Sequence, residues 1–149
     1  MAAVLACVAL LLVTAHPPAA GAGDVSATVV ANPLTLVLDV PPEPVETGRR
    51  IRAVATVANA GASPVTDVVL TIHTPGAVRV YRDATASIRR IRGDGSAMAA
   101  WHLCVDEPLV NGGYILTVTG EAVGPTGETY PIAGGAAVLT ATAGRRPCR

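Results

Sequence analysis

The most reactive side chains in the sequence are cysteines, and two of the three are expected to remain in the mature protein. Cys104 and Cys148 remain once an N-terminal leader, which carries Cys7, is removed. An exported chain then meets an oxidising compartment. We therefore predict a disulfide between Cys104 and Cys148, which pins the C-terminal tail and contributes about 4 kcal/mol by closing a long loop. Two free thiols, or a bridge between two molecules, are the alternatives.

A metal site is the next chemistry to consider, because Met98, His102 and Cys104 fall on one face of an expected strand. Copper in a secreted β-sandwich is held by two His and one Cys, with Met as a weak ligand. In cupredoxin-like chains the second His and the Met follow the Cys, whereas here both precede it. We therefore predict no metal and no cofactor, and these three residues are the metal candidates of an alternative interpretation.

The basic residues are all Arg, and the tetrapeptide Arg-Arg-Ile-Arg occurs twice, at 49–52 and 89–92. In strands each isoleucine would point inward, and the flanking arginines outward. If the two strands are neighbours, the outward side chains form a basic stripe that binds anionic glycans or a partner's carboxylates. That stripe consists of Arg50, Arg52, Arg90 and Arg92. The alternative is a set of solvated edge charges that discourage edge-to-edge pairing.

Catalytic patterns are not found, and we predict no enzyme. The four serines stand outside any G-x-S-x-G elbow, and no H-E-x-x-H motif or phosphate-binding glycine loop occurs. Asp106 and Glu107 are adjacent, so their side chains would diverge on a strand instead of flanking a bond. Residues 92–94 spell Arg-Gly-Asp, which we interpret as hairpin-turn chemistry.

The elements that position these residues are short strands. Turn signals rich in Gly, Pro and Asn recur along the chain, and the segments between them are β-branched or small, with apolar residues in alternation. No segment after residue 23 keeps a helical period for three turns. We expect strands at 26–31, 34–40, 50–58, 66–73, 77–82, 86–92, 97–105, 113–122, 127–132 and 135–142, some of them merged or spurious.

This pattern predicts an all-β fold, a two-sheet immunoglobulin-like sandwich of about seven to nine antiparallel strands, with a small closed barrel as the alternative. Trp101 should face the core because its indole is the largest apolar group. Alternation then places Cys104 with Met98, Ala100 and His102 on the opposite face. The predicted core consists of Ile51, Val57, Leu70, Trp101, Leu103, Tyr114 and Leu116.

The N-terminus has the pattern of a secretory signal peptide. Residues 4–13 are an unbroken apolar run, too short to span a membrane, and Ala20-Gly21-Ala22 offers a cleavage site before Gly23. An uncleaved anchor is the competing interpretation. We divide the chain into a signal peptide, expected to be helical (1–22), an N-terminal strand or linker (23–33), the sandwich (34–143) and a tail (144–149). We expect secretion or retention in the cell envelope, with no membrane span after cleavage.

Charge and composition exclude several partners. The eleven arginines are balanced by eleven acidic residues, so a general attraction to nucleic acid or anionic membranes is not expected. No aromatic side chain is interleaved with the arginines to stack on bases. The chain is 50% hydrophobic and 15% charged, which is unlike a disordered tail.

A family resemblance rests on a series of turn and strand motifs. A Val-rich strand ends in Asn59-Ala60-Gly61, the turn Gly93-Asp94-Gly95-Ser96 precedes the strand with Trp101, and Gly113-Tyr114-Ile115-Leu116-Thr117-Val118 follows. The series resembles bacterial extracellular Ig-like modules of the CARDB (cell-adhesion-related) type. The resemblance implies a sandwich fold and a spacer, adhesion or accessory role without catalysis.

We therefore expect an exported, non-enzymatic Ig-like protein that acts by surface contact with an unidentified protein or glycan at the cell surface. The alternative function is a small secreted sandwich that binds a ligand or a metal through the arginines or through the face of Met98, His102 and Cys104.

Overall fold

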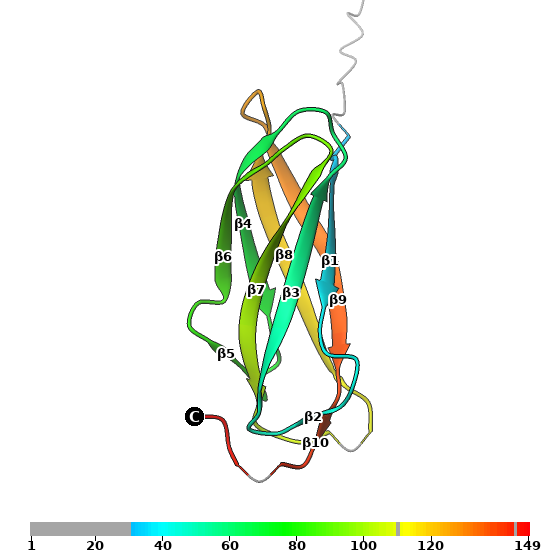
Figure 1. The fold of residues 1–149 in the computed structure, drawn as a ribbon, viewed down its shortest axis with the longest axis vertical. Coiled ribbons are helices and arrows are strands. Elements are labelled where there is room, and N and C mark those ends of the chain that lie inside the picture. The colour runs from blue at the N-terminus through cyan, green and yellow to red at the C-terminus, as the bar shows by residue number, and fades with distance from the viewer. Residues whose placement is uncertain (1–30, 110, 145) are drawn as a thin grey trace, which may run out of the picture. The chain divides into compact units, whose positions relative to one another are not determined.

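The computed structural model describes residues 31–149 apart from 110 and 145, and this part contains ten strands and no helix (Figure 1). The strands alternate buried and exposed residues, as half-buried strands do. They are β1 (Leu34–Asp39), β2 (Val45–Glu46), β3 (Arg50–Asn59), β4 (Val65–His73), β5 (Val78–Tyr81), β6 (Thr85–Ile91), β7 (Gly95–Val105), β8 (Tyr114–Val123), β9 (Thr129–Leu139) and β10 (Ala141–Thr142).

Eight of these strands form two antiparallel sheets that face each other. One sheet has the order β1-β3-β7-β5 and the other β6-β4-β8-β9 (Figure 1). The chain crosses between the sheets after β3, β4, β5, β6 and β7, which gives the immunoglobulin-type sandwich. The predicted all-β sandwich is therefore confirmed, and the closed barrel is wrong because the two sheets share no ladder. A short parallel ladder of β2 and β10 lies apart from both sheets.

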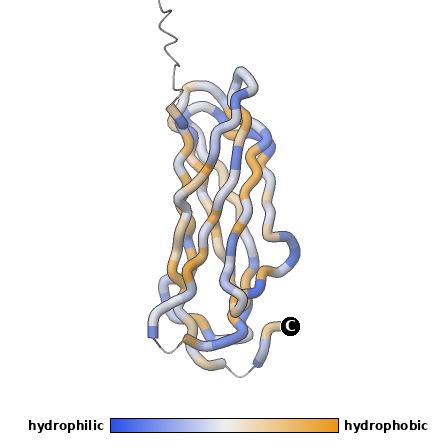
Figure 2. The backbone as a smooth tube through the Cα atoms, turned by 180° about the vertical axis from the view of Figure 1, so that it is seen from behind, coloured by the Kyte–Doolittle hydropathy of each residue, from blue (hydrophilic) through white to orange (hydrophobic). Residues whose placement is uncertain are grey.

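The core lies between the sheets and is built from aliphatic side chains, with Trp101, Tyr114 and Tyr130 as its aromatic members. Orange and pale segments alternate along the strands in Figure 2, as expected where one face is buried. Trp101 is 3% exposed and Leu103 is fully buried. All seven core residues predicted from the sequence are buried: Ile51, Val57, Leu70, Trp101, Leu103, Tyr114 and Leu116.

The strand boundaries differ from the predicted ones mainly in the C-terminal third. The sequence suggested a turn at Gly134-Gly135, but β9 continues through it. Gly134 has φ +101°, and the β8–β9 register shifts between Val118 and Gly120, so these glycines belong to a β-bulge. The two-residue strand β2 was not predicted. The predicted strand at 26–31 extends into residues outside the described part, and the predicted signal peptide lies wholly outside it.

None of the described residues belongs to a helix that is long and apolar enough to cross a membrane.

Candidate functional site

The Cys104–Cys148 disulfide lies where the C-terminal tail meets the outer face of the β1-β3-β7-β5 sheet. The two Cα atoms are 5.9 Å apart, and the bridge joins residues 44 positions apart in the chain. Both cysteines are buried, although their neighbours His102 and Arg149 are exposed. The predicted intramolecular bridge is confirmed, and it fixes the tail on the sheet.

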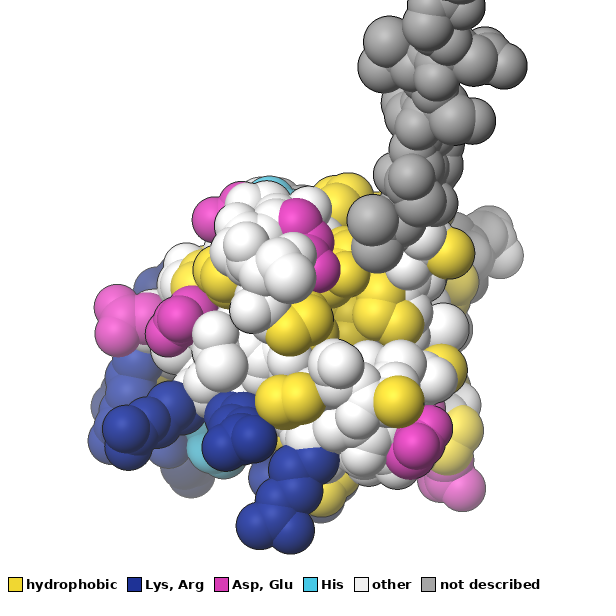
Figure 3. Space-filling model, turned by 90° about the horizontal axis from the view of Figure 1, so that it is seen from above, with side chains coloured by type: hydrophobic (Ala, Val, Ile, Leu, Met, Phe, Trp, Pro, Cys, Tyr) yellow, Lys and Arg dark blue, Asp and Glu magenta, His cyan; other side chains and the backbone are white. Residues whose placement is uncertain are grey.

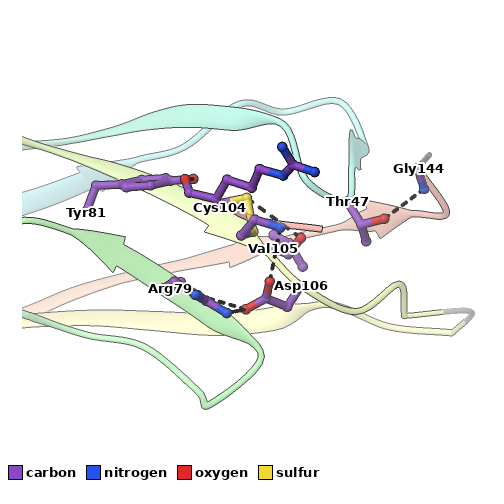
Figure 4. The surroundings of a disulfide bond; sticks show 9 residues. Thr47, Arg79, Tyr81, Cys104, Val105, Asp106 and Gly144 are labelled. Atoms are coloured by element: carbon purple, nitrogen blue, oxygen red, sulfur yellow. Dashed lines mark hydrogen bonds and ion pairs between the residues drawn. A yellow bond between two sulfur atoms is a disulfide. The ribbon is translucent and has the colours of Figure 1, made fainter. Parts of the chain in front are cut away.

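Hydrogen bonds hold the tail on both sides of the disulfide (Figure 4). The Cys148 backbone N–H donates to Asp106 Oδ1 at 3.3 Å, and the Tyr81 hydroxyl donates to the Arg149 carbonyl at 2.7 Å. Asp106 Oδ2 also accepts two bonds from the Arg79 guanidinium, at 2.8 and 3.1 Å. The end of the chain is therefore connected to β5, to β7 and to the residue after β7.

The register of three strands gathers arginines around this point. Arg50 on β3 and Arg79 on β5 both pair with Cys104 of β7, and Arg52 and Tyr81 both pair with the next outward residue, His102. Residues paired across antiparallel strands lie on the same face of the sheet. The outer face therefore carries two short rows, Arg50–Cys104–Arg79 and Arg52–His102–Tyr81.

Tyr81 is the aromatic centre of this basic cluster. The Arg50 guanidinium carbon lies 4.2 Å from the Tyr81 ring centroid, a cation–π contact. Within the described residues, Arg79–Asp106 is the only ion pair. No carboxylate of the described chain therefore lies within ion-pair distance of Arg50, Arg52 or Arg82.

Two adjoining hollows open beside Tyr81. The first has a volume of about 290 Å³ and is lined by Arg50, Tyr81, Arg82 and His102. The second has a volume of about 310 Å³, shares three of those residues and extends to Asp83, Thr85 and Trp101. They occupy the place where the chain leaves β5 and crosses to β6 in the other sheet. Together they form a small groove, which we call the Tyr81 groove.

Trp101 forms part of the groove wall and carries a buried donor. Its indole nitrogen is the one buried side-chain polar atom in the described part of the chain that has no hydrogen-bond partner. An unpaired buried donor costs about 1–3 kcal/mol. Arg82, on the same groove, has φ +65°, a left-handed conformation that arginine rarely adopts. The Trp101 nitrogen has no accessible surface, so this donor belongs to the core rather than to the open part of the groove.

The predicted stripe of four arginines is not formed across neighbouring strands. Arg50 and Arg52 lie on β3 and Arg90 on β6, and these strands belong to different sheets. The isoleucines of both tetrapeptides are buried and the arginines exposed, as predicted. The stripe is wrong because strand alternation gives the face of a residue but does not give the sheet that its strand joins. Arg50 and Arg52 instead join Arg79, Arg82, Tyr81 and His102.

The Arg-Gly-Asp tripeptide lies at the β6–β7 turn and is held there by the neighbouring loop. The Asn59 side chain donates to the Arg92 carbonyl at 3.1 Å, and the Asp94 N–H donates to the Gly61 carbonyl at 3.0 Å. Asp94 itself has a left-handed φ of +52°. These contacts show that the tripeptide forms part of the β6–β7 turn, as predicted.

The three metal candidates share a face but do not make a ligand set. Met98 and His102 are exposed on the outer face of β7, whereas the Cys104 sulfur is bonded to Cys148 and has no thiolate to offer. No cluster of three or more His, Cys, Asp or Glu side chains suited to a metal occurs within residues 31–149, as far as they are described.

Three residues of the site were not singled out in the sequence: Arg79, Tyr81 and Arg82. Asp106 was considered there only as a catalytic carboxylate beside Glu107, and its contact with the tail was not predicted. The alternation of 77–82 does place Arg79 and Tyr81 on one face of a strand. The sequence does not reveal that this strand pairs with β7. That pairing brings Arg79 beside Cys104 and Tyr81 beside His102.

Comparison with known proteins supports the fold alone. No protein-family profile and no curated protein sequence matches the chain. Among solved structures, the Northeast Structural Genomics Consortium target SoR45 is 13% identical with a TM-score of 0.51, over 73% of this chain and 87% of that one. The ASH/PapD-like domain 7 of human CEP192 is 10% identical with a TM-score of 0.41, over 84% of this chain and 99% of that one.

Proposed function

We propose that this chain is an exported, non-enzymatic Ig-like module of the CARDB kind, and that it acts in the cell envelope by surface contact with an anionic partner. The observation that carries the proposal is the buried Cys104–Cys148 disulfide beside a cluster of unpaired arginines. A structural disulfide fits an oxidising compartment, in agreement with the signal-like N-terminal sequence. The arginines give the contact its chemistry, because their planar guanidinium groups bind carboxylates, sulfates and phosphates with two hydrogen bonds.

The lining of the Tyr81 groove fits binding better than reaction. It presents guanidinium donors, aromatic side chains and the single carboxylate of Asp83. A hydrolytic site would need a nucleophile held by a base, or two carboxyl groups that flank a bond. The metal-binding alternative is weaker, since the disulfide consumes Cys104.

Export is tested by expressing the full chain without a tag in a bacterial host and measuring its intact mass in each cell fraction. We expect the protein outside the cytoplasm, shortened by removal of residues 1–22, with no free thiol before reduction. The control variant is Leu11→Arg, which interrupts the apolar run and should keep the protein full-length in the cytoplasm. A full-length wild-type chain in the cytoplasm, with two free thiols, would contradict the proposal.

A further inference from the structure

We infer that the first hollow beside Tyr81 binds one tetrahedral oxyanion, a sulfate or phosphate group, between the guanidinium groups of Arg50 and Arg82. The inference deepens the proposed function, on which it rests, by naming the charged group of the anionic partner and the place where it binds. It is carried by three observations at one position: two arginines without a carboxylate partner, a hollow that both of them line, and an aromatic contact that orients one of them.

The strand order brings the two arginines together. Because β7 separates β3 from β5, the Arg50 side chain has to cross β7 to make its contact with the Tyr81 ring. Its guanidinium group therefore lies on the side of the sheet from which Arg82, the residue after Tyr81, enters the hollow. The exposed His102 of β7 lines the same hollow between them.

Both arginines are held in place before a ligand arrives. Arg50 lies over the Tyr81 ring, and the Tyr81 hydroxyl is held by the Arg149 carbonyl, so the Arg50 guanidinium loses less side-chain freedom on binding. Arg82 has a φ of +65°, a conformation that Gly or Asn would adopt at lower cost. An arginine at this strained position is better explained by its side chain than by the turn.

Charge and the number of acceptor atoms determine which anion fits best. Two guanidinium groups carry two positive charges, and each offers a planar fork of N–H donors. A sulfate ion, or a phosphate group near neutral pH, spreads up to two negative charges over three or four oxygens, so it can accept from both forks. A carboxylate has one charge and two oxygens, which a single fork already occupies. We therefore expect a tetrahedral oxyanion to bind more tightly than a carboxylate.

The surroundings of the two arginines limit the charged part of the ligand to one compact group. No acidic residue lines the first hollow, and Asp83 lines only the adjoining one. The first hollow, of about 290 Å³, has room for one oxyanion and several water molecules of about 30 Å³ each. A second anionic group placed toward the adjoining hollow would meet the Asp83 carboxylate, where like charges repel.

The experiment is a titration of the purified, oxidised protein with sodium sulfate, followed by calorimetry and by NMR of the backbone amides. Sodium chloride keeps the ionic strength constant, which separates specific binding from general screening of surface charge. We expect one saturable site, with amide shifts centred on Arg50, Tyr81 and Arg82. Sodium acetate, the carboxylate probe, should bind at least tenfold more weakly than sulfate. Inorganic phosphate at about pH 8, where it is a dianion, should bind as sulfate does.

One further titration distinguishes the sources of the oxyanion. Glucose 6-phosphate carries a dianionic phosphate on a neutral sugar. If it binds as tightly as inorganic phosphate, the hollow accepts the group from a larger molecule, whereas at least tenfold weaker binding assigns the hollow to the free ion. Both results support the inference, because the group bound is the same.

Variants place the binding on the molecule. Arg50→Gln and Arg82→Gln should each weaken sulfate binding at least tenfold. Arg52→Gln is the matched control on the same face, since Arg52 is exposed on β3 but does not line the hollow, and it should weaken binding less than threefold. Arg90→Gln, with the same change of charge on the other sheet, should alter it less than twofold. Thermal unfolding of each variant confirms that it is folded.

Three results would overturn the inference: no saturable binding of sulfate, equal effects of Arg52→Gln and Arg82→Gln, or binding of acetate as tight as that of sulfate. The third result would leave a carboxylate site, and the proposed function would stand. The proposed function fails separately, through the cell-fractionation experiment, whatever the sulfate titration gives.

Discussion

At the residue scale, the Cys104–Cys148 disulfide both stabilises the fold and holds the C-terminal tail beside the candidate site. Cys104 lies on the outward face of β7, with Met98 and His102, yet it is buried because the tail covers it. Its sulfur therefore serves as an attachment point rather than as a ligand. The tail is also held at its start, where the Gly144 backbone N–H donates to the Thr47 hydroxyl at 2.8 Å (Figure 4). The hydrogen bonds of Asp106 and Tyr81 lie at its far end, beside Cys148, and are expected to depend on the disulfide.

The double variant Cys104→Ser/Cys148→Ser tests the contribution of the bridge. A disulfide that joins residues 44 positions apart restricts the unfolded chain, and the loss is expected to lower the free energy of unfolding by about 4 kcal/mol. The measurement is urea unfolding of the oxidised wild type and of the variant. As a control, reducing agent should destabilise the wild type and leave the variant unchanged. Equal stability of the two proteins would show that the bridge does not restrict the unfolded chain.

At the element scale, the alternation of apolar and polar residues predicted where most strands lie, but it could not predict which strands pair with one another. The predicted strands at 50–58, 66–73 and 97–105 agree with β3, β4 and β7 to within two residues at each end. The alternation is a local property, so it can be read from neighbouring residues. The choice of β7 as the partner of β5 depends on packing across the whole sandwich, and for this reason the groove around Tyr81 was not predicted.

Gly120 on β8 is required by the close approach of β4. A Cβ atom at this position would lie 2.1 Å from the Val69 carbonyl oxygen and 3.1 Å from the Leu70 Cα, both of them backbone atoms. Gly120→Ala should therefore push the two strands apart and lower the free energy of unfolding by about 1–3 kcal/mol. The matched control is Gly76→Ala, where no atom lies within 4 Å, and it should leave the stability unchanged or slightly raised. Chemical denaturation of both variants gives the comparison.

The β8–β9 turn has a built-in dependence on pH through Glu128. Hydrogen bonds from the Thr126 hydroxyl (2.5 Å) and the Tyr130 hydroxyl (2.6 Å) to its carboxylate lower the pKa of Glu128 from 4.5 to about 2. A carboxyl group with a lowered pKa stabilises the fold above its unfolded pKa, and this stabilisation is lost as the pH falls from about 4.5 towards 2.

Glu128→Gln should remove this dependence. The difference in the free energy of unfolding between wild type and variant is expected to be constant above pH 5 and to shrink as the pH falls to 2.5. Thr126→Val, which removes the first of the two hydroxyl bonds, should raise the pKa of Glu128 in the folded protein. The loss of stability should then still begin near pH 4.5, but it should be smaller and end at a higher pH. Unfolding curves recorded between pH 2.5 and 7 provide the measurement, and parallel curves for all three proteins would contradict the assignment.

At the scale of the whole molecule, a net charge of zero conceals an uneven distribution. The basic side chains gather on one side of the described part, with a histidine among them, in the view of Figure 3. Composition gives the total and cannot give the arrangement, which depends on the strand order. A local basic surface on a neutral protein favours a specific anionic partner over general attraction to polyanions, because the long-range field remains weak.

The anchored tail is expected to support ligand binding as well as stability, because it holds Tyr81 in place. It connects β7, through the disulfide, to Tyr81 at the end of β5, and Tyr81 in turn supports Arg50 on β3. In the double variant Cys104→Ser/Cys148→Ser the tail should leave, and Tyr81 and Arg50 would then have to be ordered by the ligand. Ordering costs about 0.5–1.5 kcal/mol for each side chain, or about 1–3 kcal/mol for the two, so binding of inorganic sulfate at Arg50 should weaken about fivefold to 150-fold. Calorimetry measures this change at a temperature where the variant is folded. A chain that ends at residue 143 should match the double variant, since both lack the anchored tail, whereas wild-type affinity in either protein would show that Arg50 needs no support from the tail.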